Sequence, residues 1–164
     1  MNDLEKQFRR LERSFDKVLD IRNRDPVEYE DDVWSFIHNS WHLKDYMRTD
    51  GKSLHKNVRK RVETDVNSFW KLVLIGDLAN RTRHLKVNDR ETDEEIQNRE
   101  LRIVSLKDPG EGNGDITLIV TDGMKLEYPV RDLAKDNMRI WHTLFKLYGL
   151  RHLLEKKKPP PSQR

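Results

Sequence analysis

Apolar residues recur at intervals of three and four along much of this chain, and no other feature restricts its fold as strongly. In the first segment they stand at Leu4, Phe8, Leu11, Phe15, Val18 and Leu19. This period places them on one face of an α-helix, which is stable only when that face packs against other elements. The sequence therefore predicts a helical bundle.

Turn-forming and capping residues divide this pattern into about four helices. Pro26 begins the second helix, the Thr-Asp-Gly turn at residues 49–51 ends it, and Ser53 can cap the third. The third helix could break near Thr64. We expect helices over residues 2–24, 26–48, 53–84 and 132–148.

A different pattern separates the third helix from the last one. Residues 101–106, 116–120 and 126–130 are short runs rich in β-branched and aromatic residues, with turn-forming residues between them. They predict a three-strand antiparallel meander near residues 100–130. The expected fold is thus mainly α with a small β insertion (α+β) before the last helix.

The chain length of 164 residues suits one domain with a single core. We expect this domain to span residues 1–155, followed by a flexible Lys/Pro-rich tail at 156–164. The N-terminus is charged and lacks an apolar signal core, and no run approaches the ~18 apolar residues that span a bilayer. These features favour a cytoplasmic protein that does not enter a membrane.

Two apolar helical segments each carry polar residues on one face. These residues are His38, His42 and Asp45, spaced i, i+4 and i+7, and Asp77, Asn80 and His84, spaced i, i+3 and i+7. The segment around Asp77 is apolar almost all round, so we expect this carboxylate to be buried with a partner. If the two helices pack antiparallel, the six side chains could form one buried or cleft-lining cluster.

Three interpretations of this cluster stay open. The first is a structural network, in which histidine, asparagine and carboxylate side chains satisfy one another. The second is a site for a divalent transition metal such as Zn, Fe or Mn. Its candidate ligands are His38, His42, Asp45 and His84, because the chain has no cysteine to supply thiolates.

The third interpretation is an acid–base site or a nucleic-acid site. The candidate catalytic residues are His42, Asp45, Asp77, Asn80 and His84. A histidine would move the proton and an aspartate would orient its ring. The candidate phosphate-binding residues are Lys56, Arg59, Lys60 and Arg61, followed by Arg81, Arg83 and Lys86.

The tryptophans occur in apolar helical contexts, at Trp34, Trp41, Trp70 and Trp141. We expect all of them in the core rather than as platforms on which nucleic-acid bases stack.

Two motifs resemble those of known bacterial proteins. Residues 41–46 (W-H-L-K-D-Y) and 77–86 (D-L-A-N-R-T-R-H-L-K) look like the H-L-K-D and D-x-A-N-x-x-x-H signatures of small bacterial helical proteins of unassigned activity. This resemblance covers residues 33–87, the expected strands and the last helix, and it implies a shared bundle with a β insertion.

A second resemblance is to HEPN-type ribonuclease domains, which are small helical bundles with an Arg followed, after four to six residues, by a His. Arg48 and His55 have that separation. In that family the motif lies near the start of a helix, whereas here it spans the turn at residues 49–51. The resemblance implies a ribonuclease activity.

These features lead us to expect a binding or interaction protein, with nucleic acid or another protein as its partner. The alternative is an enzyme that uses the same cluster, either a HEPN-like ribonuclease or a His/Asp metal-dependent hydrolase.

Overall fold

The computed structural model describes the backbone of residues 2–21, 24–50, 52–87, 100–106, 116–121 and 127–155. It describes side chains for all of these except residues 81–87, 100–106, 116–121 and 127. The expected tail at 156–164 therefore lies outside the described residues, as do the side chains of Arg81, Arg83, His84 and Lys86.

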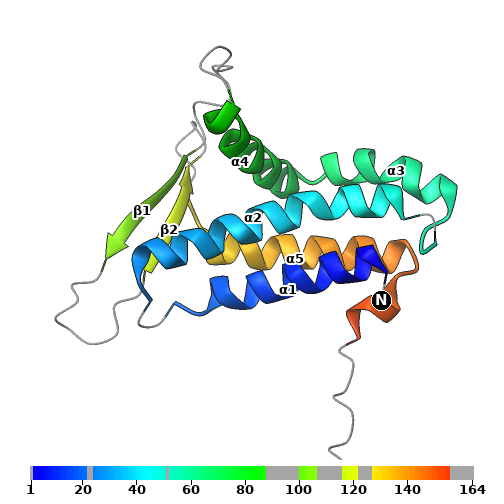
Figure 1. Cartoon of the computed structure of the whole chain (residues 1–164), viewed down its shortest axis with the longest axis horizontal. Coiled ribbons are helices and arrows are strands. Elements are labelled where there is room, and N and C mark those ends of the chain that lie inside the picture. The colour runs from blue at the N-terminus through cyan, green and yellow to red at the C-terminus, as the bar shows by residue number, and fades with distance from the viewer. Residues whose placement is uncertain are drawn as a thin grey trace, which may run out of the picture.

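The predicted helical fold is confirmed. The described residues form helices α1 (Asp3–Leu19), α2 (Pro26–Thr49), α3 (Lys56–Asn67), α4 (Trp70–Val87), α5 (Val130–Leu147) and the short α6 (Arg151–Leu154). Figure 1 shows α1, α2 and α5 running alongside one another, with α3 beside α2 and α4 leaning away from the bundle. Among these helices, none is long and apolar enough to cross a membrane.

The expected single helix over residues 53–84 is wrong, because the chain changes direction after Asn67. Ser68 terminates α3: its backbone N–H donates to the carbonyl oxygens of Thr64 and Asp65, and its hydroxyl donates to the Asp65 carbonyl at 2.6 Å. These bonds satisfy carbonyl groups that the last turn of a helix leaves open. The break thus lies four residues later than Thr64.

The other helix ends follow from local chemistry. Asp25 accepts hydrogen bonds from the N–H groups of Val27 and Glu28 at 2.9 and 3.1 Å, with proline at the first helical position of α2. Gly149 ends α5 with a φ of 76°, a conformation that glycine adopts without steric strain.

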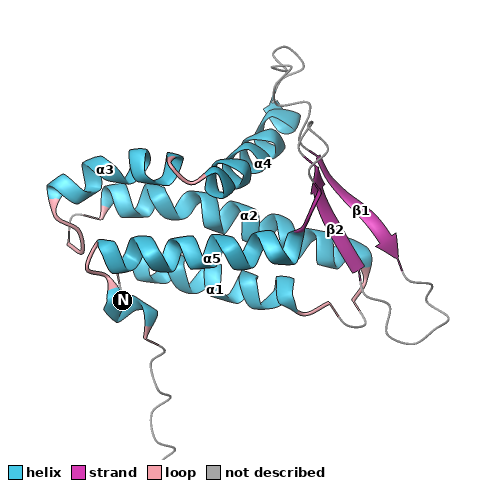
Figure 2. Ribbon diagram, turned by 180° about the vertical axis from the view of Figure 1, so that it is seen from behind, coloured by secondary structure: helices cyan, strands magenta, loops and turns pink. Residues whose placement is uncertain are grey.

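Three short strands lie between α4 and α5: β1 (Glu100–Leu106), β2 (Ile116–Thr121) and β3 (Glu127–Pro129). They pair antiparallel in the order β1-β2-β3, with Ile103 opposite Leu118 and Val120 opposite Tyr128. The sheet lies at the end of the bundle where α2 begins, and Figure 2 shows the same arrangement from behind. Val130 belongs to α5 and not to the third strand.

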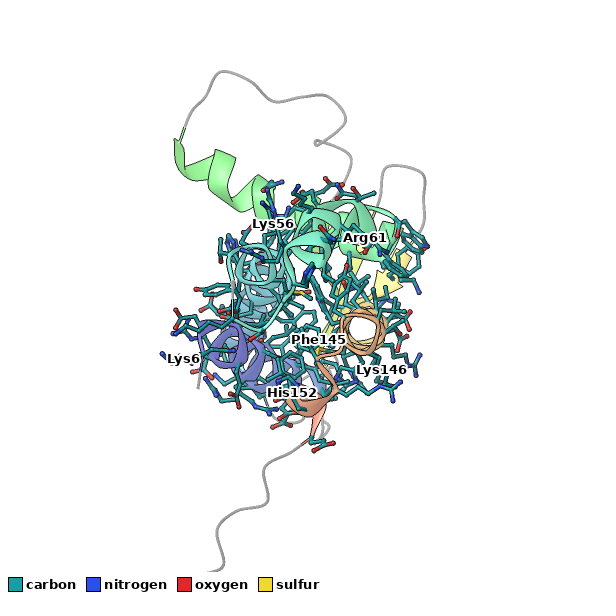
Figure 3. All side chains as sticks on the ribbon, turned by 90° about the vertical axis from the view of Figure 1, so that its right-hand side faces the viewer. Lys6, Lys56, Arg61, Phe145, Lys146 and His152 are labelled. Carbon is teal, nitrogen blue, oxygen red and sulfur yellow. The ribbon has the colours of Figure 1, made fainter. Side chains whose placement is uncertain are left out.

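The core forms where α1, α2 and α5 meet, around fully buried Phe8, Phe36 and Phe145. Figure 3 shows Phe145 at the centre of the molecule. The Trp141 indole N–H donates to the Ser40 hydroxyl at 2.9 Å, which satisfies both polar groups and links α5 to α2. This packing holds α2 in place and so positions its outward-facing residues.

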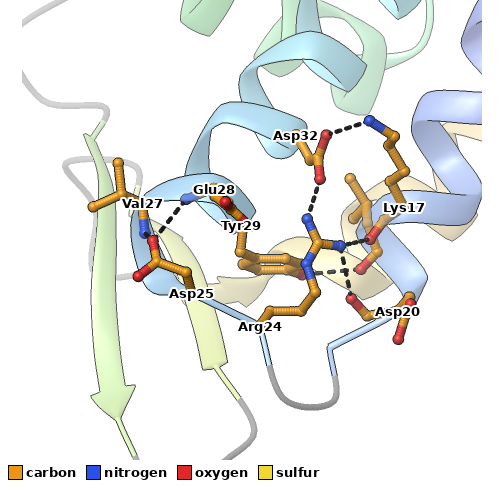
Figure 4. Close-up of polar contacts among 9 residues, drawn as sticks. Lys17, Asp20, Arg24, Asp25, Val27, Glu28, Tyr29 and Asp32 are labelled. Atoms are coloured by element: carbon orange, nitrogen blue, oxygen red, sulfur yellow. Dashed lines mark hydrogen bonds and ion pairs between the residues drawn. The ribbon is translucent and has the colours of Figure 1, made fainter.

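An ionic corner connects α1 to α2 (Figure 4). Asp32 accepts hydrogen bonds from Arg24 and from Lys17, the latter at 3.1 Å. Burial alone would raise the pKa of Asp32, but these two cations hold it below its usual range. Beside this corner, the buried Tyr29 hydroxyl donates to the Val18 carbonyl at 2.9 Å.

The tryptophans do not all lie in the core as expected. Trp141 is fully buried, and Trp34 and Trp41 are partly buried against the core. Trp70, the first residue of α4, is 52% exposed. The helix break after α3 places it at a corner of the fold, which its apolar sequence context does not reveal.

Candidate functional site

A ladder of half-buried rings runs along one face of α2. The rings of Trp34 and His38 have centroids 6.4 Å apart, and those of His38 and His42 are stacked with centroids 6.3 Å apart. His42 Nδ1 lies 3.2 Å from Asp45 Oδ2, and the two side chains are 34% and 49% exposed. This pairing orients the His42 ring and leaves it accessible to solvent.

Helix α4 meets α2 at a close contact between Gly76 and Trp41. A Cβ atom on Gly76 would lie 2.5 Å from an indole ring carbon of Trp41, so only glycine allows the two helices to come this close. The contact brings the α4 turn that precedes Asp77 and Asn80 against the α2 turn of Trp41 and His42. The two helices that carry the polar segments therefore pack against each other at this point.

The expected burial of Asp77 is wrong, because the structure leaves this residue half-buried. Asn80, His38, His42 and Asp45 are half-buried as well. Figure 1 shows that α4, which carries Asp77, leans away from the bundle. Asp77 and His38 each have interaction partners within the chain.

Metal ligation was one interpretation of this cluster. Among residues with described side chains, no group of three His, Cys, Asp or Glu residues is placed to hold a metal ion. Of the candidate ligands, His42 and Asp45 meet each other and His38 stacks on His42. The fourth, His84, lies outside the described side chains.

Sequence reasoning missed a second set of contacts, which joins α3 to α2. Glu63 on α3 accepts from Lys44 and from Arg48 of α2, both at 2.9 Å. The Lys44 side chain is only 9% exposed, and its ammonium lies 3.7 Å from the centroid of the Trp41 ring. A lysine three residues after a tryptophan on a helix is the only sequence signal that could have suggested this stack.

The basic segment lies largely on the solvent-facing side of α3. Lys52, Lys56 and Lys60 are exposed and Arg59 is half-buried. Figure 3 shows Lys56 and Arg61 on one side of the molecule, with Lys6 and Lys146 on the other. Three of the predicted basic residues of the 56–61 segment, Lys56, Lys60 and Arg61, are therefore exposed, and Arg59 is only partly so.

Asp65 carries a separate set of contacts on the side of α3 that faces α5. The Tyr148 hydroxyl donates to Asp65 at 2.6 Å, and Arg61 lies 3.5 Å from the same carboxylate. Burial and the Asp65 carboxylate both raise the pKa of Tyr148. Arg61 is thus engaged by an acidic residue, unlike the other basic residues in the first turns of α3.

The Arg48–His55 pair is divided between two helices. Arg48 lies in the last turn of α2 and pairs with Glu63. His55 caps α3, where its ring accepts a hydrogen bond from the backbone N–H of Asn57 at 3.3 Å. Each residue therefore has a structural partner of its own.

Comparison with known proteins adds no family to this description. No family model matches the chain, and no curated protein or solved structure is significantly similar to it.

Proposed function

We propose that this protein binds the phosphate backbone of a nucleic acid along the solvent-facing side of α3. The observation that supports it most directly is a group of basic residues whose side chains form no salt bridge with a described carboxylate: Lys52, Lys56, Arg59 and Lys60. Of these, Lys52 lies close enough to Asp50 for its charge to lower the pKa of that carboxyl. We call these four residues the α3 basic face. Three of them stand at i, i+3 and i+4, so they share one side of the helix.

The neighbouring cations differ from this face because each already pairs with a carboxylate. Lys44 and Arg48 bind Glu63, and Arg61 lies beside Asp65. Glu63 and Asp65 are the only acidic residues of α3, and both are held by these contacts. The acidic residues of α3 are therefore engaged by cations outside the α3 basic face, which forms no salt bridge with them.

Like charges at this spacing oppose folding by a few tenths of a kcal/mol per pair. The chain has 29 acidic residues against 32 basic ones, so it contains enough carboxylates to pair most of its cations. The absence of paired carboxylates from the α3 basic face supports a role of this face in attracting an anionic partner.

A nucleic acid suits this surface better than an acidic protein does. Helix α3 has 12 residues, which makes it about 18 Å long, and its unpaired cations occupy its first turns and the loop before it. Phosphates repeat at short, regular intervals along a nucleic-acid strand, so several cations on one helix can each find one.

The test is an affinity measurement by fluorescence anisotropy with a labelled oligonucleotide at low salt. Lys56→Ala combined with Lys60→Ala should weaken binding at least tenfold, because both cations contact phosphate. Lys6→Ala combined with Lys146→Ala removes the same charge from the other side of the molecule and should change the affinity less than twofold. Equal losses in the two double variants, or no binding by the unmodified protein, would refute the proposal.

One observation favours a second candidate, an acid–base ribonuclease. Asp45 binds Nδ1 of His42, which leaves Nε2 of an accessible imidazole available to move a proton. His42→Ala should then abolish oligonucleotide hydrolysis while leaving binding intact. A rate unchanged by this substitution would exclude His42 as the acid or base.

A further inference from the structure

Trp70 forms an exposed aromatic platform at the end of α3 opposite the basic residues. It follows α3 by three residues and begins α4. Its ring pairs with that of Tyr128 on β3, with centroids 5.4 Å apart, and the Lys71 ammonium lies 5.3 Å from its centroid. With 52% of Trp70 exposed, part of the indole still faces solvent.

The surroundings hold this indole in place and keep the nearby charge positive. Asp136 on α5 pairs with Lys71 and also with Arg139, the latter at 3.1 Å. Two cations thus neutralise one carboxylate, and the Arg139 side chain is 78% exposed. An indole beside an aromatic neighbour and a nearby ammonium is an arrangement on which nucleic-acid bases can stack.

An exposed row of residues runs along α3 from the basic face to the end of the helix. Lys56, Lys60, Thr64 and Asn67 are all exposed and share one side of α3, and Trp70 follows three residues after its end. The row contains no carboxylate, because Glu63 and Asp65 lie on the flanks of α3 and are engaged there. A strand bound to the lysines could therefore follow α3 to the indole without meeting an unpaired negative charge.

We propose that the nucleic acid bound by this protein is single-stranded, with phosphates on the α3 basic face and an unpaired base stacked on Trp70. This inference rests on the proposed function. Bases in a duplex are stacked on one another and cannot cover a protein indole, whereas every base of a single strand has a free face. The exposed aromatic residue therefore discriminates between the two forms of nucleic acid, which the lysines alone do not.

The experiment compares a single-stranded oligonucleotide with a duplex of the same length and mixed sequence, using fluorescence anisotropy. The unmodified protein should bind the single strand more tightly. Trp70→Ala should weaken single-strand binding about tenfold, the effect of losing one stacked base, and leave duplex binding within twofold. Leu147→Ala removes another exposed apolar side chain, at the end of α5, and should affect neither.

The outcomes separate the two proposals. Failure to bind either oligonucleotide would refute the proposed function itself. Binding that depends on Lys56 and Lys60 but shows no single-strand preference, or an equal loss of both affinities in Trp70→Ala, would overturn only the inference about single strands. Self-association that Trp70→Ala abolishes, measured by sedimentation velocity, would also overturn it, because the indole would then contact a second copy of the chain.

Discussion

Replacing Gly76 with alanine should destabilise the protein, although alanine is the better helix former. The added Cβ would lie 2.5, 2.6 and 2.8 Å from three carbons of the Trp41 indole ring, whereas carbons in ordinary contact are about 3.5–4.0 Å apart. The ring would have to retreat by about 1 Å. This movement would also disturb Lys44, whose ammonium lies 3.7 Å from the ring centroid.

The magnitude follows from two opposing effects. Overfilling a packed contact destabilises by about 1–3 kcal/mol. Replacing glycine with alanine inside a helix stabilises by about 1 kcal/mol. We expect Gly76→Ala to lower the free energy of unfolding by up to about 2 kcal/mol, which is a decrease in Tm of up to about 4–8 °C for a chain of this size.

The cause can be isolated in a second background, with urea unfolding followed by circular dichroism. In Trp41→Leu the ring atoms that collide are absent, so Gly76→Ala should become stabilising by up to about 1 kcal/mol. Gly149→Ala is the matched control. Its φ of +76° strains any other residue, and no atom lies within 4 Å of the added Cβ, so its loss should be equal in both backgrounds.

Two results would refute this reasoning. One is a Gly76→Ala variant that is more stable than the unmodified protein. The other is a loss of stability that persists unchanged in the Trp41→Leu background, because the collision would then not be its cause.

Three further predictions concern buried or paired polar groups. Glu63→Ala removes a carboxylate from the buried Lys44 ammonium and should lower the free energy of unfolding, measured by thermal denaturation, by about 1–3 kcal/mol. Asp132→Ala, which breaks an exposed pair, should change it by less than about 0.5 kcal/mol. Equal losses of stability in the two variants would contradict the burial of the ammonium. Burial raises the pKa of Tyr29 to about 12, so its contribution to stability is present below the usual phenol pKa of about 10 and is lost as the pH rises toward 12. Tyr29→Phe should therefore lose less stability than the unmodified protein between about pH 10 and 12. An identical dependence of stability on pH in the two proteins would contradict the raised pKa of Tyr29. The hydrogen bond from a lysine holds the pKa of Asp136 below its usual range, so its contribution is lost as the pH falls below about 4. Asp136→Asn should make the loss of helical ellipticity at acid pH less steep. A steeper loss would contradict the lowered pKa of Asp136.

The predicted helix boundaries succeeded where they depend on local chemistry. Asp25 caps α2 through its own side chain, with proline next to it, so the start of this helix is determined by two neighbouring residues. The His42–Asp45 pair is also local, because a spacing of three residues brings the two side chains together on any helix.

Features that depend on distant residues could not be predicted in the same way. The end of α3 at Ser68 has no proline or glycine to mark it, and the exposure of Trp70 follows from the new direction of the chain. The incomplete burial of Asp77 reflects the angle of α4. The Gly76–Trp41 contact joins residues that lie 35 positions apart in the sequence. The spacing of apolar residues within α4 predicts neither the exposure of Asp77 nor the contact of Gly76 with Trp41.

The measurement that tests nucleic-acid binding most directly is the dependence of affinity on salt concentration. Each phosphate neutralised by a lysine contributes about 0.7 to the slope of log K against log [salt] for a single strand and about 0.9 for a duplex. Replacing both Lys56 and Lys60 with alanine should reduce this slope by about 1.4–1.8, and the Lys6, Lys146 double variant should leave it unchanged. A slope equal in all three proteins would contradict phosphate binding at the α3 basic face.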